Sequence, residues 1–170
     1  MARVDHAEDL RSPPAETPRS SDDFAAWVMP CLQAMTNLAV RLVGSPDRDD
    51  LVQESLSQAW RRWETYKPER GSPQTWLLAI VADRARRARR RRKATAMWSG
   101  QEQFTPDGAD PDLERAVQGL AKRQRLAVEL HYFVGLTTAE TALVMSCAEG
   151  TVKSALHDAR TNLRRVLEEP

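Results

Sequence analysis

The sequence predicts an all-α protein made of two small helical domains, and three observations support this prediction. Apolar residues recur at spacings of three and four in several segments, as on one face of a helix, and no segment alternates as a strand does. A stretch with two glycines and two prolines, residues 94–111, separates the helical segments. The chain has 170 residues, enough for two domains above the lower limit of about 50 residues. We therefore expect domains at 24–93 and 112–170, joined by a flexible linker at 94–111.

The first 23 residues are predicted to be a disordered tail. They contain Pro13, Pro14 and Pro18 among acids and serines, and such a composition buries too little apolar surface to order itself. Helical periodicity begins at Phe24 and continues through Trp27, Cys31, Leu32, Met35, Leu38, Ala39 and Leu42. The sequence Gly44-Ser45-Pro46 ends this helix.

Two more helices follow in the first domain. One is expected to start between Asp47 and Asp50, because acids in a first turn suit the positive end of the helix dipole. The other is expected to start near Thr75, after the helix-breaking segment TYKPERGSPQ. Its first half is apolar, whereas the run from Arg84 to Lys93 holds eight basic residues in ten.

The second domain ends in a predicted helix-turn-helix. After helices near 112–119 and 122–134, and a candidate C-terminal cap at Gly135, a short helix TTAETALVM leads through the turn SCA into a long helix from Glu149 to about Leu167. The long helix has an apolar stripe of Val152, Leu156, Ala159, Leu163 and Val166, beside a face with Lys153, His157, Arg160 and Arg164. Periodicity alone also fits an amphipathic helix of any bundle.

Charge is distributed unevenly along the chain. Residues 24–93 hold fourteen bases and seven acids, a net charge of +7, whereas residues 110–170 hold eight bases and nine acids, a net charge of −1. The first domain therefore has the field that attracts a polyanion. The basic run taken alone also fits a solvated helix end or a disordered basic arm.

Several classes of protein lack support in the sequence. Cys31 and Cys147 stand apart with no metal-ligand spacing, and neither a catalytic triad order, a paired-carboxylate site nor a glycine-rich phosphate loop is visible. We therefore expect no catalytic residue, no metal and no cofactor. No apolar run or signal core is long enough to enter a membrane, so we expect no membrane insertion and a cytoplasmic location.

The second domain resembles the promoter-reading domain of bacterial sigma factors. The resemblance rests on the segments LAKRQRLAVELHYFVGLTTAETA and SCAEGTVKSALHDARTNLRRVL. The resemblance implies binding of the −35 promoter element through Arg123, Glu149, Thr151, Lys153, Ser154, His157 and Arg160. Ala155 and Asp158 stand where the family has bases, and Ala121, Ser146 and Ala148 replace a usual proline, glycine and capping serine. We therefore expect a weak grip on the −35 element, with Glu149 or a water replacing the cap.

The first domain resembles the polymerase-binding domain of the same family. The string DDLVQESLSQAWRRWETYKPERGSPQTWLLAIVADRARRARRRRK carries this resemblance. It implies docking on the clamp helices of the largest subunit of RNA polymerase through Asp50, Leu51, Gln53 and Glu54. It further implies −10 contacts by Lys67, Arg70, Trp76, Asp83, Arg84, Arg87, Arg90 and Arg91, with the loop 64–74 capturing a flipped base. Asp83 and Arg87 replace a usual asparagine and aspartate. Because an ionised carboxylate only accepts hydrogen bonds, Asp83 should favour an amino group such as that of cytosine.

Both segments, in this order and without an intermediate domain, resemble the extracytoplasmic-function class of sigma factors. The resemblance implies core RNA polymerase, including the flap of its second-largest subunit, promoter DNA and an anti-sigma factor as partners, and no enzymatic activity. Two alternatives stay open at this point. One is a free-standing helix-turn-helix regulator, which would bind a palindromic site without polymerase. The other is a sigma-like interaction protein that does not bind DNA.

Overall fold

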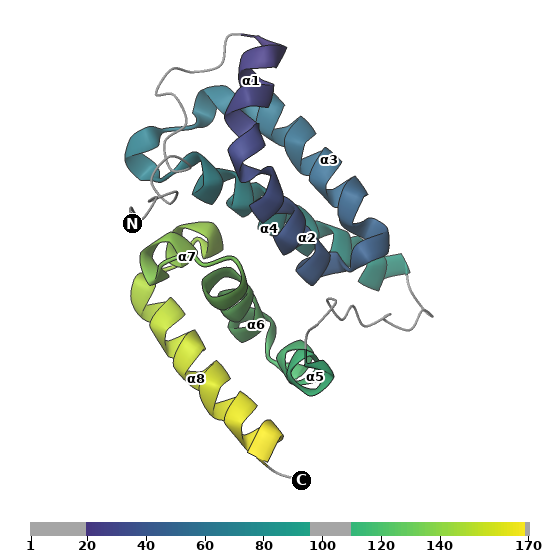
Figure 1. The fold of residues 1–170 in the computed structure, drawn as a ribbon, viewed down its shortest axis with the longest axis vertical. Coiled ribbons are helices and arrows are strands. Elements are labelled where there is room, and N and C mark those ends of the chain that lie inside the picture. The colour runs from purple at the N-terminus through teal and green to yellow at the C-terminus, as the bar shows by residue number, and fades with distance from the viewer. Residues whose placement is uncertain (1–19, 96–109, 169–170) are drawn as a thin grey trace, which may run out of the picture.

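The computed structural model describes residues 20–95 and 110–168, and its regular elements there are all helices (Figure 1). This confirms the all-α prediction. The first group comprises α1 (Ser21–Val28), α2 (Leu32–Val43), α3 (Ser45–Arg62) and α4 (Pro73–Thr95). The second group comprises α5 (Pro111–Gly119), α6 (Lys122–Val128), α7 (Thr138–Met145) and α8 (Glu149–Glu168). Short 3₁₀ turns lie at Met29–Cys31, Trp63–Thr65 and Pro68–Arg70, and a π-helix lies at Glu129–Phe133.

Prolines set the helix boundaries that periodicity alone placed wrongly. The single helix predicted from Phe24 is interrupted by a 3₁₀ turn that contains Pro30. Conversely, α3 and α4 begin earlier than predicted, with Pro46 and Pro73 in their first turns, because proline lacks only an N–H that a first turn leaves unpaired.

The N-terminal tail is also shorter than predicted. The helix α1 begins at Ser21 and is capped by Ser20, whose side chain accepts a hydrogen bond from the backbone N–H of Asp23 at 3.2 Å. Residues 21–23 are therefore helical. The rest of the predicted tail, residues 1–19, and most of the predicted linker, residues 96–109, lie outside the described residues.

Each helical group has a hydrophobic core. Fully buried side chains of the first core include Met35, Leu38, Leu77, Leu78 and Val81. The second core is built from Val117, Ala127, Val128, Ala142, Val152, Ala155, Leu156 and Ala159. Val166, the last residue of the apolar stripe predicted for the long C-terminal helix, is 52% exposed.

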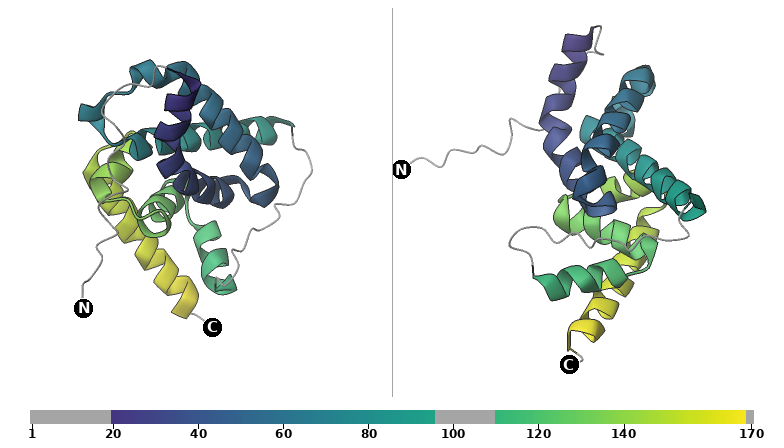
Figure 2. Two further views of the ribbon diagram at one scale, coloured as in Figure 1. Left: turned by 45° about the horizontal axis from the view of Figure 1, so that its top comes forward. Right: turned by 90° about the vertical axis from the view of Figure 1, so that its right-hand side faces the viewer.

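The two groups of helices also pack directly against each other. Helix α7 packs against α4 (Figures 1 and 2). The first core continues across the boundary to Leu130, Leu136 and Val144. The prediction of two domains joined by a linker is therefore incomplete, because the domains share buried apolar surface as well. None of the helices in the described ranges is both long and apolar enough to span a membrane.

Candidate nucleic-acid and polymerase interface

Helix α4 carries a run of exposed arginines. Its first half is anchored in the core by Leu77, Leu78 and Val81. Its second half leaves the core, and Arg86, Arg87, Arg90 and Arg91 are exposed. A helix held at one end and cationic at the other can lie along a nucleic-acid backbone.

Three ion pairs organise the start of this basic surface. The carboxylate of Asp83 lies 2.8 Å from Arg87 Nε and 3.7 Å from an Nη of Arg86. Arg84 turns the other way and reaches Glu54 of α3, with 2.8 Å between Arg84 Nη2 and Glu54 Oε2. A hollow of 190 Å³ lies between these two helices, lined by Glu54, Arg84, Arg87, Ala88 and Arg91. Asp83, which is predicted to contact a base, is thus already paired with Arg87.

The loop that precedes α4 is built on aromatic side chains. Tyr66 lies edge-on to Trp27, with ring centroids 5.2 Å apart, and to Trp76 at 5.8 Å. Its hydroxyl donates a hydrogen bond to the carbonyl of Gly71 at 3.1 Å, and burial raises its pKa. Tyr66 and Trp76 therefore shape the loop from within, whereas Lys67 and Arg70 are exposed on it.

The first turns of α3 present the residues predicted to dock on polymerase. Asp50, Gln53 and Glu54 are exposed. Leu51 is only 5% exposed and belongs to the first core. It therefore anchors the helix beneath the three polar side chains and adds little to their surface.

The predicted helix-turn-helix is present as α7, a turn and α8. Thr137 and Glu140 form a capping box at the start of α7. Ser146 ends the helix with φ 52° and ψ 50°, in the left-handed region, which is the conformation that the family's glycine adopts without strain. The Cys147 N–H donates to the carbonyl of Ala142 at 3.0 Å and closes the turn.

Glu149 is engaged by side chains on both sides of this turn. Its Oε1 accepts a hydrogen bond from Thr138 Oγ1 at 2.7 Å and lies 2.9 Å from Lys153 Nζ. The hydrogen bond from Lys153, and then that from Thr138, lowers the pKa of Glu149. The carboxylate thus connects the two helices and partly neutralises Lys153, the cation predicted to contact DNA.

The exposed face of α8 contains most of the residues predicted for the −35 element. Lys153, Ser154, His157 and Arg160 are exposed, Thr151 is half-buried, and Arg123 is exposed at the start of α6. Ala155, one of the two positions where the family has a base, is 5% exposed in the second core. Asp158, the other position where the family has a base, is exposed, so its negative charge lies on the surface.

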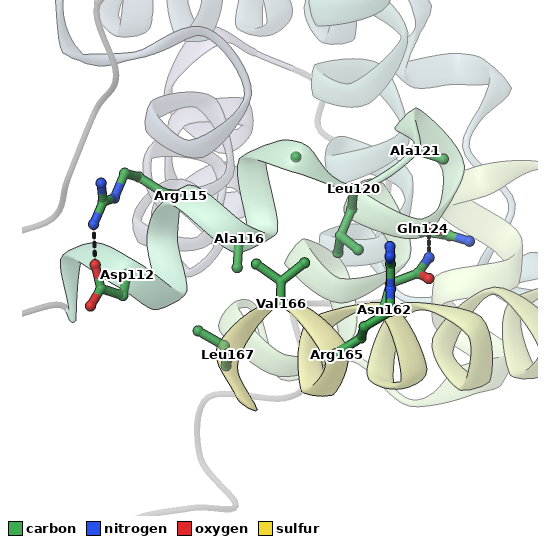
Figure 3. A pocket seen from close by; sticks show the side chains of 11 residues that line it. Asp112, Arg115, Ala116, Leu120, Ala121, Gln124, Asn162, Arg165, Val166 and Leu167 are labelled. Atoms are coloured by element: carbon green, nitrogen blue, oxygen red, sulfur yellow. Dashed lines mark hydrogen bonds and ion pairs between the residues drawn. The ribbon is translucent and has the colours of Figure 1, made fainter. Parts of the chain in front are cut away.

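A groove of 710 Å³ lies on the opposite end of the second helical group (Figure 3). It runs between α5, the start of α6 and the last turns of α8, with Ala116, Leu120, Val166 and Leu167 on its apolar walls and Arg115 and Arg165 beside them. Asn162 Nδ2 donates to Gln124 Oε1 at 3.2 Å and ties α8 to α6 at one side of the groove. On α8 this groove is formed by the last turns, away from Lys153 and Ser154, whereas Arg123, also predicted to contact DNA, lies in the chain between the lining residues Ala121 and Gln124.

Sequence reasoning missed a buried ionic cluster between the two domains. Arg41 of α2 donates to Glu129 and Glu114, and all three side chains are at most 8% exposed. The available signal was a charge inside an apolar pattern: Arg41 lies among Leu38, Ala39 and Leu42, and Glu129 stands inside the run AVELHYF. In the described part of the chain, His, Cys, Asp and Glu side chains form no group of three that could hold a metal ion.

Comparison with known proteins matches both domains. The family model for Sigma-70 region 2 matches residues 27–95, and that for Sigma-70 region 4 matches residues 111–163. The ECF RNA polymerase sigma factor SigL of Mycobacterium tuberculosis is 34% identical over 143 residues, covering 77% of this chain and 81% of its own. The RNA polymerase sigma-E factor of Streptomyces coelicolor is 31% identical over 153 residues, covering 85% and 86%.

Two solved structures share the fold. The sigma factor RpoE from Bartonella quintana, in complex with the anti-sigma factor NepR, has a TM-score of 0.69 at 24% identity and covers 87% of this chain and 98% of its own. CnrH, in complex with the cytosolic domain of CnrY, has a TM-score of 0.67 at 20% identity and covers 88% and 90%. Since two sigma-70 regions match in order and the relatives are similar over most of both chains, the protein belongs to the extracytoplasmic-function sigma factors, which direct RNA polymerase in transcription initiation.

Proposed function

We propose that this sigma factor divides its work between an N-terminal domain, residues 24–93, that docks on polymerase and opens the −10 region, and a C-terminal domain, residues 112–170, that reads the −35 element. The observation that carries this proposal is the arrangement of α3 and α4. An acidic docking surface of Asp50, Gln53 and Glu54 lies beside the exposed arginines of α4. One domain therefore has a surface for a protein and a surface for DNA next to each other.

In the N-terminal domain, the docking surface binds the clamp helices of the largest polymerase subunit. Polar side chains over a buried leucine suit an interface that forms and dissociates. The exposed residues of α4 and the preceding loop then contact the −10 strand, with Lys67, Arg70, Arg87, Arg90 and Arg91 donating to phosphates and bases. Arg84 takes part once Glu54 binds polymerase, because Glu54 pairs with Arg84 in the isolated chain.

In the C-terminal domain, the N-terminal end of α8 enters the major groove at the −35 element. Lys153, Ser154, His157 and Arg160 are exposed along one face there, and a helix of this kind contacts bases with its N-terminal residues. The groove in Figure 3 lies at the other end of α8 and stays open in that orientation. Its apolar walls and the nearby arginines suit an amphipathic segment, and we assign it to the flap of the second-largest subunit.

Regulation by a partner also belongs to this proposal. One solved structure is of the sigma factor RpoE bound by NepR, which is named as an anti-sigma factor, and the other is of CnrH bound by the cytosolic domain of CnrY. A protein that binds across both domains would block docking and promoter binding together. The work of such a factor takes place in the cytoplasm, without a catalytic group or cofactor of its own.

Run-off transcription tests the proposed function. Purified protein is added to core polymerase free of other sigma factors, with a library of promoter fragments as template. Specific run-off products that need both proteins support the proposal. A DNA complex without polymerase would instead indicate a free-standing regulator, and the absence of both would indicate an interaction protein.

A further inference from the structure

The contact between the two domains contains a buried arginine that is met by two carboxylates. Arg41 Nε donates to Oε2 of Glu129, and Arg41 Nη2 donates to Oε1 and Oε2 of Glu114 at 3.0 and 3.2 Å. Glu129 is completely buried, and the side chains of Arg41 and Glu114 are 8% and 5% exposed. Arg41 comes from the N-terminal domain, whereas both glutamates come from the C-terminal domain.

Further contacts hold the same arginine in place. Its guanidinium lies 3.3 Å above the ring of Phe133. Arg125 Nη2 donates to the carbonyl of Arg41 at 2.7 Å. Leu130, Leu136 and Val144 continue the first core beside this cluster. Three segments of the C-terminal domain therefore converge on one turn of α2, which defines a single docked arrangement.

In the docked arrangement, the two predicted DNA-reading helices lie too close together to reach both promoter elements. Helix α7 packs against both α4 and α8, and since packed helix axes lie about 8–10 Å apart, the two predicted DNA-reading helices lie about 20 Å apart. The centres of a −10 and a −35 element are separated by about 25 base pairs, which is about 85 Å of duplex. Residues 96–109 could span about 50 Å when fully extended, so the chain can reach both elements only after its domains separate.

We propose that Arg41, Glu114 and Glu129 form an ionic latch that keeps the free sigma factor closed, and that the latch opens when polymerase and promoter bind the two domains. This rests on the proposed function only for the placement of α4 and α8 on the two elements. The closed state itself rests on the contacts between the domains.

The chemistry of the cluster suits a latch better than a permanent bond. Burying three charges removes them from water, and their mutual attraction offsets that loss only in part. Burial raises the pKa of Glu129 in spite of the hydrogen bond from Arg41 and the nearby Arg125, which is consistent with incomplete compensation. Opening returns all three charges to water together. The latch therefore selects one alignment of the domains, while its three charges add little to the free energy needed to separate them.

Small-angle scattering of the full chain tests the latch. A compact chain of this length has a radius of gyration of about 15 Å, and two domains separated by about 50 Å give more than about 25 Å. We expect the wild-type chain near the lower value and Arg41→Met near the higher one, because the substitution leaves two buried carboxylates without their main partner. Arg48→Met is the matched control, since Arg48 pairs with the adjacent Asp49 within the same domain. It should stay compact.

Two outcomes would overturn the latch: an extended wild-type chain, or an Arg41→Met variant as compact as the control. Circular dichroism verifies that the helices of each variant remain folded. If Arg41→Met loses helical signal, Glu129→Gln takes its place. That variant keeps a hydrogen-bond acceptor and removes one charge, and it should show an intermediate radius with faster amide exchange in α7. Unchanged size and exchange in Glu129→Gln would then overturn the latch.

Transcription also measures whether the latch is closed. If only the open fraction of the sigma factor binds polymerase and promoter, its apparent affinity for them falls in proportion to that fraction. Arg41→Met should therefore reach half-maximal run-off transcription at a concentration at least threefold below that of the wild type and of Arg48→Met, and an unchanged concentration would count against the latch. The scattering result is independent of promoter recognition, so failure of the latch and failure of the proposed function are distinguishable.

Discussion

The carboxylate of Asp83 lies 2.8 Å from Nε of Arg87, one turn further along α4. The two positions at which the family pattern has asparagine and aspartate are thus occupied by an acid and a base that pair with each other. The pair engages Nε of Arg87, and a guanidinium has further N–H donors on its two terminal nitrogens.

Replacing Asp83 by asparagine should therefore alter −10 preference without altering assembly. Asp83→Asn removes the ion pair and frees Arg87, so we expect discrimination at one −10 base to change by about five- to tenfold, in the range of one well-formed base contact. Transcription from a promoter library measures the preference, and titration with core polymerase measures assembly. A promoter profile identical to that of the wild type would contradict a reading role for this pair.

The docking surface of α3 offers a neighbouring pair of acids for comparison. Asp50→Asn should weaken binding to core polymerase by about 1 kcal/mol, roughly fivefold, as expected for a charge at an interface rim. Asp49→Asn is the control, because Asp49 pairs with Arg48 on the same helix and is not predicted to dock. Fluorescence titration with core polymerase measures both. Equal effects of the two substitutions would remove Asp50 from the docking surface.

Glu149 should limit the strength of −35 binding. Glu149→Gln removes the charge that pairs with Lys153 and reduces repulsion of DNA phosphates, so we expect tighter binding of a −35 promoter by the holoenzyme. Lys153→Ala should weaken it and lower the slope of log affinity against log salt by about 1, as for one phosphate contact. Arg164→Ala serves as the control, because Arg164 lies near the far end of α8 beside Glu168. A Lys153→Ala slope equal to that of Arg164→Ala would argue against the contact.

The groove between α5 and α8 should be needed for polymerase and not for folding. Val166→Asp places a charge on a wall that is already 52% exposed, so the variant should keep its unfolding temperature while −35-dependent transcription falls at least threefold. Met29→Asp, at a residue 65% exposed in the other domain, is the control. Full transcription by Val166→Asp would exclude the groove as the site for the flap.

The two thiols should differ in reactivity and in their effect on stability. Burial raises the pKa of Cys31 from 9.0 to about 11, so Cys147 should be alkylated first in the native chain at pH 8. Above pH 9 the unfolded chain loses the Cys31 proton while the folded chain keeps it. The free energy of unfolding should thus fall between pH 9 and 11, by about 1.4 kcal/mol per pH unit. Urea unfolding at a series of pH values measures this free energy. Cys31→Ala should remove the part of the decrease with pH that Cys31 causes, and an unchanged decrease would contradict the buried neutral thiol.

Sequence reasoning succeeded where the signal lies within one helix. The helix-turn-helix and the change of α4 from apolar to basic were predicted correctly, since spacing along one helix determines which residues share a face. The helix breaks before Pro46 and Pro73 were also predicted correctly, but α3 and α4 begin earlier than predicted, because both prolines are first-turn residues. The burial of Ala155 in the second core was not predicted.

The sequence by itself determined that the protein is all-helical, that its basic charge lies on the first domain, and that both halves resemble a sigma factor. These properties depend on the order of residues within short segments, and they do not depend on how the rest of the chain packs. Only the tertiary structure decided that Arg84 of α4 pairs with Glu54 of α3, that Tyr66 packs between Trp27 and Trp76, and that Arg41 meets Glu114 and Glu129 at separations of 73 and 88 residues. Contacts at such separations depend on how two domains dock, and no local pattern of charge or hydrophobicity specifies that.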